Sequence, residues 1–183
     1  MREKLVVVIS GPPGAGSTSI AKGVAKKLKL KYFSPGKFQK SFGGTKKESK
    51  AALKVWKTDF GVSEEFHRNL IDRTQREKAE KGNIVICGKL SINMLKDLAD
   101  FKIWVDTPLK IRAKRTAERD KIPFKQALKE ISERERIERR EWERIYGFDY
   151  FDQKNSADFV LDNSDLTLSQ AVNKILDFLE KSL

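Results

Sequence analysis

A glycine-rich turn near the start of the chain carries the clearest chemical signal. Residues 11–18 read GPPGAGST and match the phosphate-binding pattern G-x-x-x-x-G-K-[ST] at every position but Ser17, where the pattern has lysine. The apolar run Leu5–Ile9 precedes the turn, and a segment with helical spacing, 18–30, follows it. In such a unit the backbone N–H groups and the helix dipole attract a phosphate. Thr18 is then placed to offer its hydroxyl to Mg²⁺, and Ser17 supplies a hydroxyl in place of an ammonium group.

The positive charge that this turn lacks is abundant elsewhere. The chain of 183 residues has 38 Lys and Arg against 26 Asp and Glu, a net charge of +12. Residues 1–60 alone hold 14 basic and 3 acidic residues, so we expect this part to face anions, with solvated surface lysines as the alternative. Residues 112–144 hold 12 basic and 8 acidic residues. We expect most arginines there to lie on salt-bridged helix surfaces, and two or three of them to face phosphates.

Apolar runs alternate with helical segments along the chain, which predicts a parallel sheet with helices on both faces. The runs predict strands at 4–10, 31–33, 83–87, 101–105 and 158–161. Spacing and capping residues predict helices at 18–30, 63–81, 108–119, 123–145 and from Thr167 onward, with Ser63 and Thr167 as caps. The predicted fold class is therefore α/β, a three-layer α/β/α parallel sheet like that of P-loop NTPases.

Ligands of such sheets bind beyond the carboxyl ends of the strands. Four places that are far apart in the sequence lie at such ends: the glycine-rich turn, Ser34, Gly88-Lys89 and Asp106. We expect them to meet in one cleft. Asp106 either orders Mg²⁺ there or caps the helix that starts at Pro108, and the sequence leaves both open.

Composition excludes several other kinds of protein. Hydrophobic residues make up 39% and charged residues 35%, and no apolar run approaches the roughly 20 residues of a transmembrane helix. A single cysteine, Cys87, excludes an intrachain disulfide, and a reducing, cytoplasmic location is expected. We expect Cys87 to be buried or to line the cleft. The single histidine, His67, is expected at the surface of a polar helix, and it leaves almost no material for a histidine-based catalytic triad.

Beyond the turn, several segments in order resemble those of nucleoside monophosphate kinases, and most closely the archaeal type of cytidylate kinase. They are ISGPPGAGSTS, SPGKFQK, IDRTQREKAEKGNIVICGKL, KIWVDTPLKIRAKRTAERD and ERERIERREWERIYG. The resemblance covers nearly the whole chain and is weakest across residues 43–62. The ordered set is far more specific than the phosphate loop, which many enzymes share.

The resemblance implies ATP as the phosphate donor, Mg²⁺ as its companion ion, and CMP or dCMP as the acceptor. It implies that ATP is bound by Gly11, Pro12, Pro13, Gly14, Ala15, Gly16, Ser17, Thr18 and Ser19. It implies an acceptor site made of Ser34, Gly36, Lys40, Asp72, Arg73, Gln75, Gly88 and Lys89, and catalytic arginines at Arg115, Arg119, Arg134 and Arg140. Thr18 and Asp106 remain the candidate metal ligands. Lysine stands at Lys40 and Lys89 where the family has arginine, and Cys87 stands where it has an acid; lysine keeps the charge but lacks the bidentate fork.

The resemblance also implies one P-loop kinase domain over residues 1–183. Its core would comprise 1–33, 83–111 and 147–183, with an NMP-binding insertion at 34–82 and a lid at 112–146. We expect a monomer that binds small-molecule nucleotides and neither membranes nor nucleic acid. Two alternatives stay open: a P-loop kinase with another acceptor, such as AMP or a small metabolite, and a non-catalytic nucleotide- or RNA-binding module. Ser17 and the basic first third of the chain are the features that favour the second alternative.

Overall fold

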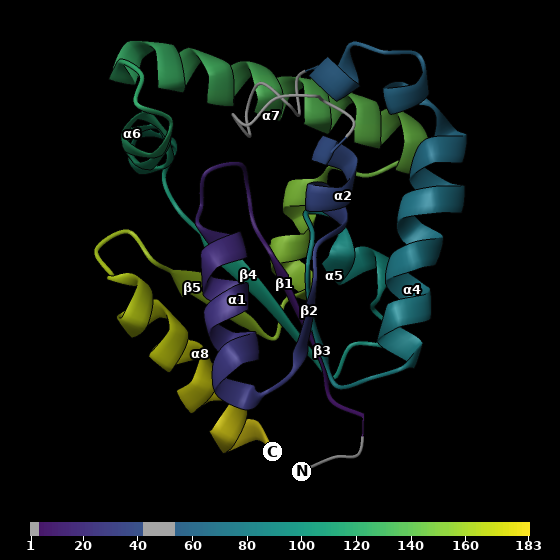
Figure 1. Cartoon of the computed structure of the whole chain (residues 1–183), viewed down its shortest axis with the longest axis vertical. Coiled ribbons are helices and arrows are strands. Elements are labelled where there is room, and N and C mark those ends of the chain that lie inside the picture. Colours follow the sequence, from purple (N-terminus) through teal and green to yellow (C-terminus); the bar gives the residue numbers. More distant parts are fainter. Residues whose placement is uncertain (1–3, 42–53) are drawn as a thin grey trace.

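A five-stranded parallel sheet forms the centre of the molecule (Figure 1). The computed structural model describes residues 4–41 and 54–183, without the side chains of 39–41. The strands are β1 (Val6–Ser10), β2 (Lys31–Phe33), β3 (Ile84–Cys87), β4 (Phe101–Asp106) and β5 (Phe159–Asp162), and their order across the sheet is β2-β3-β1-β4-β5. The central strand β1 is buried along its whole length because both of its neighbours and both helical layers cover it.

Helices cover both faces of the sheet, so the predicted three-layer α/β/α parallel architecture is confirmed. On one face, α1 (Ser17–Leu28) and α8 (Leu168–Ser182) pack against alternate β1 residues such as Val7 and Ile9. On the other face, α4 (Arg73–Glu80), α5 (Ser91–Met94) and η3 (Tyr150–Ser156) enclose Val6 and Val8. The alternation follows from the strand geometry, in which successive side chains point to opposite faces.

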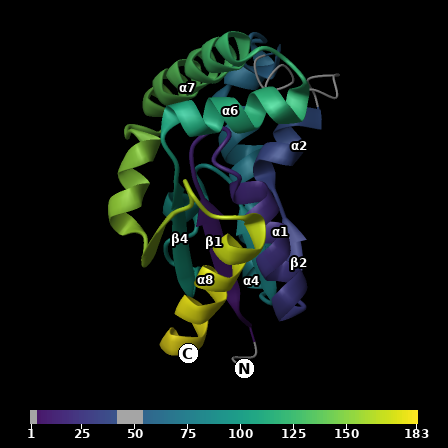
Figure 2. The same ribbon diagram turned by 90° about the vertical axis from the view of Figure 1, so that its left-hand side faces the viewer.

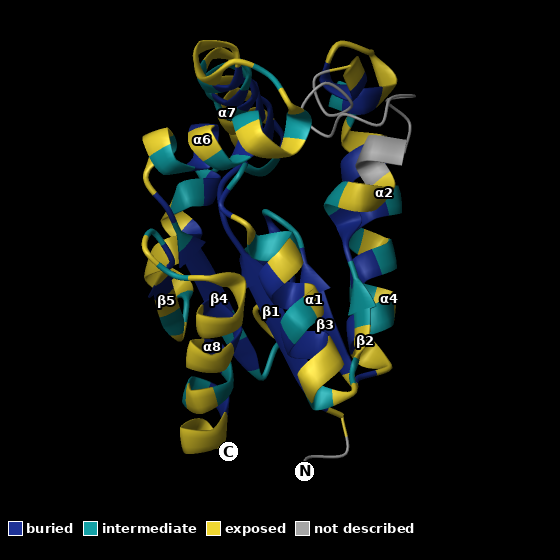
Figure 3. Ribbon diagram, turned by 60° about the vertical axis from the view of Figure 1, so that its left-hand side comes forward, coloured by how far each residue is buried: buried dark blue, intermediate teal, exposed yellow. Residues whose placement is uncertain are grey.

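The remaining elements rise over the carboxyl edge of the sheet (Figure 2). They are α2 (Pro35–Ser41), η1 (Phe60–Val62), η2 (Glu65–Asp72), α6 (Leu109–Asp120) and α7 (Phe124–Tyr146). Helices α6 and α7 pack against each other beyond the end of β4, and Figure 3 shows buried strands below them and exposed outer turns on them. Across the described residues, no helix combines the length and the apolar character that crossing a bilayer requires.

Most predicted elements are present, and their caps explain where they begin. The hydroxyl of Ser63 accepts a hydrogen bond from the amide of Phe66 at 3.1 Å, and Thr167 and Gln170 form the predicted capping box of α8. Between Ser63 and α4, however, the chain first forms the π-helix η2. The short helices α5 and η3 were not predicted. The glycine pair Gly43-Gly44, which predicts a break in a polar helical stretch, lies outside the described residues.

The prediction that His67 lies at the surface is wrong. Only 2% of this residue is exposed, because its ring stacks on that of Trp56, with the two ring centroids 4.9 Å apart. Its Nε2 lies 2.9 Å from the carbonyl oxygen of Gly61; since a carbonyl only accepts, Nε2 carries the proton and donates it. Burial lowers the pKa of His67 from 6.5 to about 4, so the ring is neutral at pH 7.

Candidate active site

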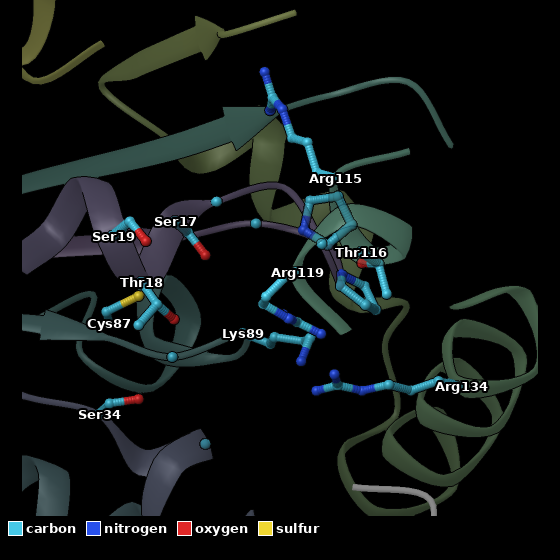
Figure 4. A pocket seen from close by; sticks show the side chains of 17 residues that line it. Ser17, Thr18, Ser19, Ser34, Cys87, Lys89, Arg115, Thr116, Arg119 and Arg134 are labelled. Carbon is cyan, nitrogen blue, oxygen red and sulfur yellow. The ribbon is translucent and has the colours of Figure 1, made fainter. Parts of the chain in front are cut away.

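A cavity of about 390 Å³ opens at the carboxyl ends of β1, β2 and β3, facing α6 and α7 (Figure 4). It brings together segments that are far apart in the sequence. The predicted site residues that line it are Gly11, Pro12, Pro13, Gly14, Gly16, Ser17, Thr18, Ser19, Ser34, Gly36, Gly88, Lys89, Arg115, Arg119 and Arg134. Cys87 and Thr116 complete the lining, and Cys87 is 4% exposed, so it is both buried and at the cleft.

The glycine-rich turn has the backbone that a phosphate site needs. Gly14 and Gly16 have φ of +80° and +86°, a left-handed region that side chains with a Cβ rarely adopt. Helix α1 begins directly after Gly16, so its first amides point out of the helix end toward the cavity. No acidic residue lies in the first turn of α1, and hydroxyl side chains at Ser17, Thr18 and Ser19 flank the opening (Figure 4).

Two buried polar side chains hold the underside of this turn. The carboxamide of Asn163 donates from Nδ2 to the carbonyl oxygen of Ala15 at 2.8 Å. The hydroxyl of Thr107 donates to Asn163 Oδ1 at 2.6 Å, which fixes the orientation of the amide. Ala15 itself is buried beneath the turn and contributes its carbonyl group to this network and no surface to the cavity. Thr107 and Asn163 were not predicted as site residues, although each lies two residues beyond the end of a predicted strand and directly after β4 or β5.

Arg112 ties the same turn to both overlying helices. Its side chain is only 5% exposed. The Nη1 atom donates to the carbonyl oxygen of Pro13 at 3.1 Å and to Glu135 Oε2 at 2.7 Å. The Nε atom donates to the carbonyl oxygen of Thr107 at 2.9 Å. Because Arg112 lies on α6 and Glu135 on α7, one guanidinium group joins the phosphate loop, α6 and α7. A buried arginine is held in this way only where several acceptors surround it.

Three cationic side chains converge on the cavity from different elements: Lys89 after β3, Arg119 on α6 and Arg134 on α7 (Figure 4). Lys89 and Arg134 share one carboxylate oxygen, Glu138 Oε1, at 3.4 Å and 2.8 Å. Burial acts to raise the pKa of Glu138, but the charges of Arg134 and Lys89 outweigh burial and leave that pKa below its ordinary value. Glu138 therefore stays ionised and keeps the two cations side by side.

Arg115 and Arg119 both line the cavity, yet they are oriented differently. The Arg115 guanidinium donates to the backbone carbonyl of Asn163 at 2.7 Å and to its side-chain oxygen at 3.1 Å, and it points away from Lys89 and Arg134 (Figure 4). Arg119 points toward Lys89 and pairs with Asp120 at 2.8 Å, with 43% of its side chain exposed. Arg115 thus braces the loop after β5 against the phosphate loop, and Arg119 is the more available of the two for a ligand.

Three predicted side chains in the described part of the chain are paired elsewhere and do not line this cavity: those of Arg140, Arg73 and Asp106. Arg140 lies on the outer side of α7 and pairs with Glu141 at 2.7 Å. Arg73 points outward and pairs with Glu77 at 2.9 Å. Asp106 binds Lys154 at 2.7 Å, and it shares a sheet face with Trp104, opposite to the face that α1 covers. The Lys40 side chain lies outside the described residues.

The other two predicted acceptor-site residues, Asp72 and Gln75, line a second, narrower cavity of about 40 Å³. Gly36, Gly88, Lys89 and Arg134 line both cavities, so the second one continues from the first. The Gln75 side chain donates from Nε2 to Asp72 Oδ1 at 3.0 Å and accepts from the Ser91 hydroxyl at 2.7 Å. The cleft therefore has a wide cationic part and a narrow part lined by Asp72 and Gln75.

The residues present fit a Mg²⁺ ion held mainly by a nucleotide. Among the described residues, no group of three His, Cys, Asp or Glu side chains could hold a metal alone. The described lining of the large cavity offers the Thr18 hydroxyl and no carboxylate. Mg²⁺ commonly keeps several waters and takes its remaining ligands from substrate phosphates, so one hydroxyl beside a phosphate site suits it.

Comparison with known proteins agrees with this architecture. The profile of the cytidylate kinase-like family matches residues 6–165. A cytidylate kinase of Staphylothermus marinus is 36% identical over 179 residues, covering 98% of each chain. One of Pyrobaculum calidifontis is 35% identical over 188 residues, covering 98% of this chain and 95% of the relative.

Solved structures support the fold. A shikimate kinase from Aquifex aeolicus superposes with a TM-score of 0.60 at 16% identity, covering 97% of this chain and 98% of that chain. A shikimate kinase from Bacteroides thetaiotaomicron gives a TM-score of 0.62 at 16% identity, covering 96% and 98%. At this identity the likeness concerns the fold alone. Taken with the family profile and the relatives that match almost end to end, the phosphate loop and its cationic cleft place this chain in the cytidylate kinase-like family.

Proposed function

We propose that this protein is a nucleoside monophosphate kinase that transfers the terminal phosphoryl group of ATP to CMP or dCMP. One observation carries the proposal: a phosphate loop at the end of β1 faces Lys89, Arg119 and Arg134 across a cavity that continues into a second pocket. This arrangement provides a donor site, a charged middle and an acceptor site in one cleft. The full-length similarity to cytidylate kinases gives the acceptor.

The donor binds at the phosphate loop. The amides around Gly14 and Gly16 and the N-terminus of α1 attract the phosphate tail of ATP, although Ser17 adds no charge. Thr18 is the residue that would hold Mg²⁺, which when bound shields the negative charge of the phosphates and helps to align them. Asn163 and Arg112 donate hydrogen bonds to the carbonyl oxygens of Ala15 and Pro13, which holds the loop in this conformation.

The acceptor binds between Ser34, Gly36 and the turn after β3. Lys89 and Arg134 lie where the large cavity meets the narrow one, so they are placed to bind the phosphate of the acceptor while its base enters the narrow pocket. Residues 34–82 form the acceptor-binding insertion in this proposal, and residues 112–146 form the lid. Lysine at position 89 binds phosphate as a point charge.

Catalysis in this proposal is mainly positioning and charge stabilisation. A phosphate oxygen of CMP attacks the γ-phosphorus of ATP in line; the bond from that phosphorus to the β,γ-bridging oxygen breaks, and ADP leaves with the bond's electron pair. Arg119 and Arg134 stabilise the charge on the transferring group. Movement of α6 and α7 toward α2 would exclude water and prevent hydrolysis of ATP.

A nucleotide panel tests this function. Purified protein is incubated with ATP, Mg²⁺ and one of CMP, dCMP, UMP, AMP or GMP, and ADP formation is followed by a coupled assay. We expect the largest kcat/KM with CMP or dCMP and little ADP release without an acceptor. A larger kcat/KM with AMP than with CMP or dCMP would show that the protein is a kinase with a different acceptor. ATP binding without stimulation by any acceptor, together with salt-sensitive RNA binding, would refute the kinase and favour a binding module.

A further inference from the structure

The narrow cavity, called the slot below, combines apolar walls with a few polar side chains. Its apolar and aromatic walls include Ile71, Leu90, Trp142 and Tyr146, while Asp72, Gln75 and Ser91 supply its polar groups. Pockets that recognise small ligands combine such apolar walls with a few convergent polar groups. The charged residues Lys89 and Arg134 at its mouth suit a ring whose phosphate remains in the larger cavity.

Asp72 is the acidic side chain of this slot, and the chain fixes both of its oxygens. Tyr146, at the end of α7, donates its hydroxyl to Asp72 Oδ2 at 2.6 Å, and Gln75 Nε2 donates to Oδ1 at 3.0 Å. Gln75 is in turn oriented by the Ser91 hydroxyl and is 1% exposed. Asp72 is therefore held between α4 and α7 in one orientation.

The carboxylate keeps capacity for a ligand. Its two oxygens offer about four acceptor positions, and the described contacts occupy two of them. Burial raises the pKa of Asp72 to about 6. The two hydrogen bonds and the charge of nearby Arg68 act in the opposite direction, but burial has the larger effect. The group is thus ionised above pH 7, where it accepts hydrogen bonds and donates none.

We propose that Asp72 determines the choice of base, by accepting a hydrogen bond from the 4-amino group of cytosine and repelling the 4-oxo group of uracil. This inference rests on the proposed acceptor function. Cytosine presents a donor at position 4 and uracil presents an acceptor, so an acceptor-only group distinguishes them directly. Gln75, Tyr146 and Ser91 act as positioning residues, since their hydrogen-bonding groups are engaged with Asp72 or with each other.

The size of the effect follows from one charged hydrogen bond. Losing such a bond in a largely buried site changes kcat/KM by about 10- to 100-fold. We therefore expect the parent protein to prefer CMP to UMP by at least about 10-fold at pH 8. The preference is measured as the ratio of the two kcat/KM values, because a change in overall stability or lid closure affects both nucleotides alike.

The test uses the variant Asp72→Asn. Asparagine keeps the size of the side chain, and its amide can donate an N–H group to the 4-oxo group of uracil. The kcat/KM for CMP should fall at least about 10-fold while that for UMP falls less or rises, so that the CMP-to-UMP ratio collapses. Asp97→Asn is the matched control, because Asp97 pairs with Arg76 on α4, the helix that follows Asp72, and lines neither cavity. This control should leave the ratio unchanged.

Tyr146→Phe provides a second variant that retains the carboxylate and removes one of its donors. It should lower the CMP-to-UMP ratio of kcat/KM by a smaller factor than Asp72→Asn does. If the Asp72→Asn variant does not fold, the ratio measured for Tyr146→Phe tests the inference in its place. Equal losses with CMP and UMP in the variants that fold would overturn the inference, as would a parent protein that uses both nucleotides equally. A parent that phosphorylates no nucleotide refutes the proposed function itself.

Discussion

Replacing Arg112→Met should destabilise the protein and weaken ATP binding together. The variant removes a guanidinium whose side chain is 5% exposed and leaves Glu135, at 19% exposed, without this partner. Breaking a buried ion pair from one side costs about 3–5 kcal/mol, and the lower end applies here because water still reaches Glu135. We expect a loss of about 3 kcal/mol, which lowers Tm by roughly 6–12 °C for a chain of this size.

The same substitution acts on the phosphate loop, because Arg112 also donates to the Pro13 carbonyl. The KM for ATP should therefore rise several-fold, whereas the KM for the acceptor should change less. Chemical unfolding gives the stability, and initial rates at varied ATP give the KM. Arg136→Met is the matched control: it makes the same change at an exposed arginine of α7 and should alter neither quantity.

A second substitution separates the lost ion pair from lost packing. In Arg112→Met with Glu135→Gln, no charge is left unpaired, so the double variant should be more stable than Arg112→Met alone. The reasoning is refuted if Arg112→Met unfolds within about 0.5 kcal/mol of the parent, or if the added Glu135→Gln gives no recovery.

Three further predictions follow from other parts of the site. Arg119→Ala should lower kcat at least about 100-fold and change stability by under about 0.5 kcal/mol, since Arg119 is partly exposed; equal turnover in initial-rate assays would remove it from the site. Gly14→Ala should weaken ATP binding in titration calorimetry, because φ is +80° there and a Cβ would lie 3.1 Å from Arg112 Cβ and Ile131 Cδ1; unchanged affinity would contradict this. Folding lowers the pKa of His67 from 6.5 to about 4, so the unfolded chain binds a proton at this residue more readily than the folded protein does. The free energy of unfolding therefore decreases as the pH falls from 6.5 to 4. Between pH 7 and 4 the parent should lose about 3 kcal/mol more stability than His67→Gln, and parallel pH profiles of the two proteins in urea unfolding would show the reasoning to be wrong.

Most strands and helices could be predicted because the residues that determine them lie close together in the sequence. A β-branched run such as Val6–Ile9 must be buried on both faces, and glycines at positions 14 and 16 permit the left-handed turn that joins it to α1. The capping residues Ser63 and Thr167 satisfy backbone amides within a few residues of themselves. These features depend on neighbours in the sequence and can be recognised there.

Tertiary contacts decide what the patterns could not predict. His67 lies in a polar stretch, but Trp56 and Gly61 enclose it after folding. Thr107 and Asn163 are single polar residues without a motif, and their role arises only when the ends of β4 and β5 meet the phosphate loop.

The arginines of α7 illustrate the same limit within one helix. Arg134 and Arg140 were both expected in the site from the family resemblance. At 3.6 residues per turn, a separation of six residues places them about 120° apart around the helix. One therefore faces the cavity when the other faces solvent, and the structure turns Arg134 inward.

The carboxylate of Glu138 also governs how the cleft responds to ionic strength. With Lys89 and Arg134 it forms a triad that carries one excess positive charge, where two cations alone would carry two. Dissolved salt weakens long-range attraction in proportion to the charges involved, and it reaches a buried carboxylate poorly. The contribution of Lys89 and Arg134 to nucleotide affinity should consequently decline only gently as salt is added. Glu138 also offsets the repulsion between these two cations before a substrate binds.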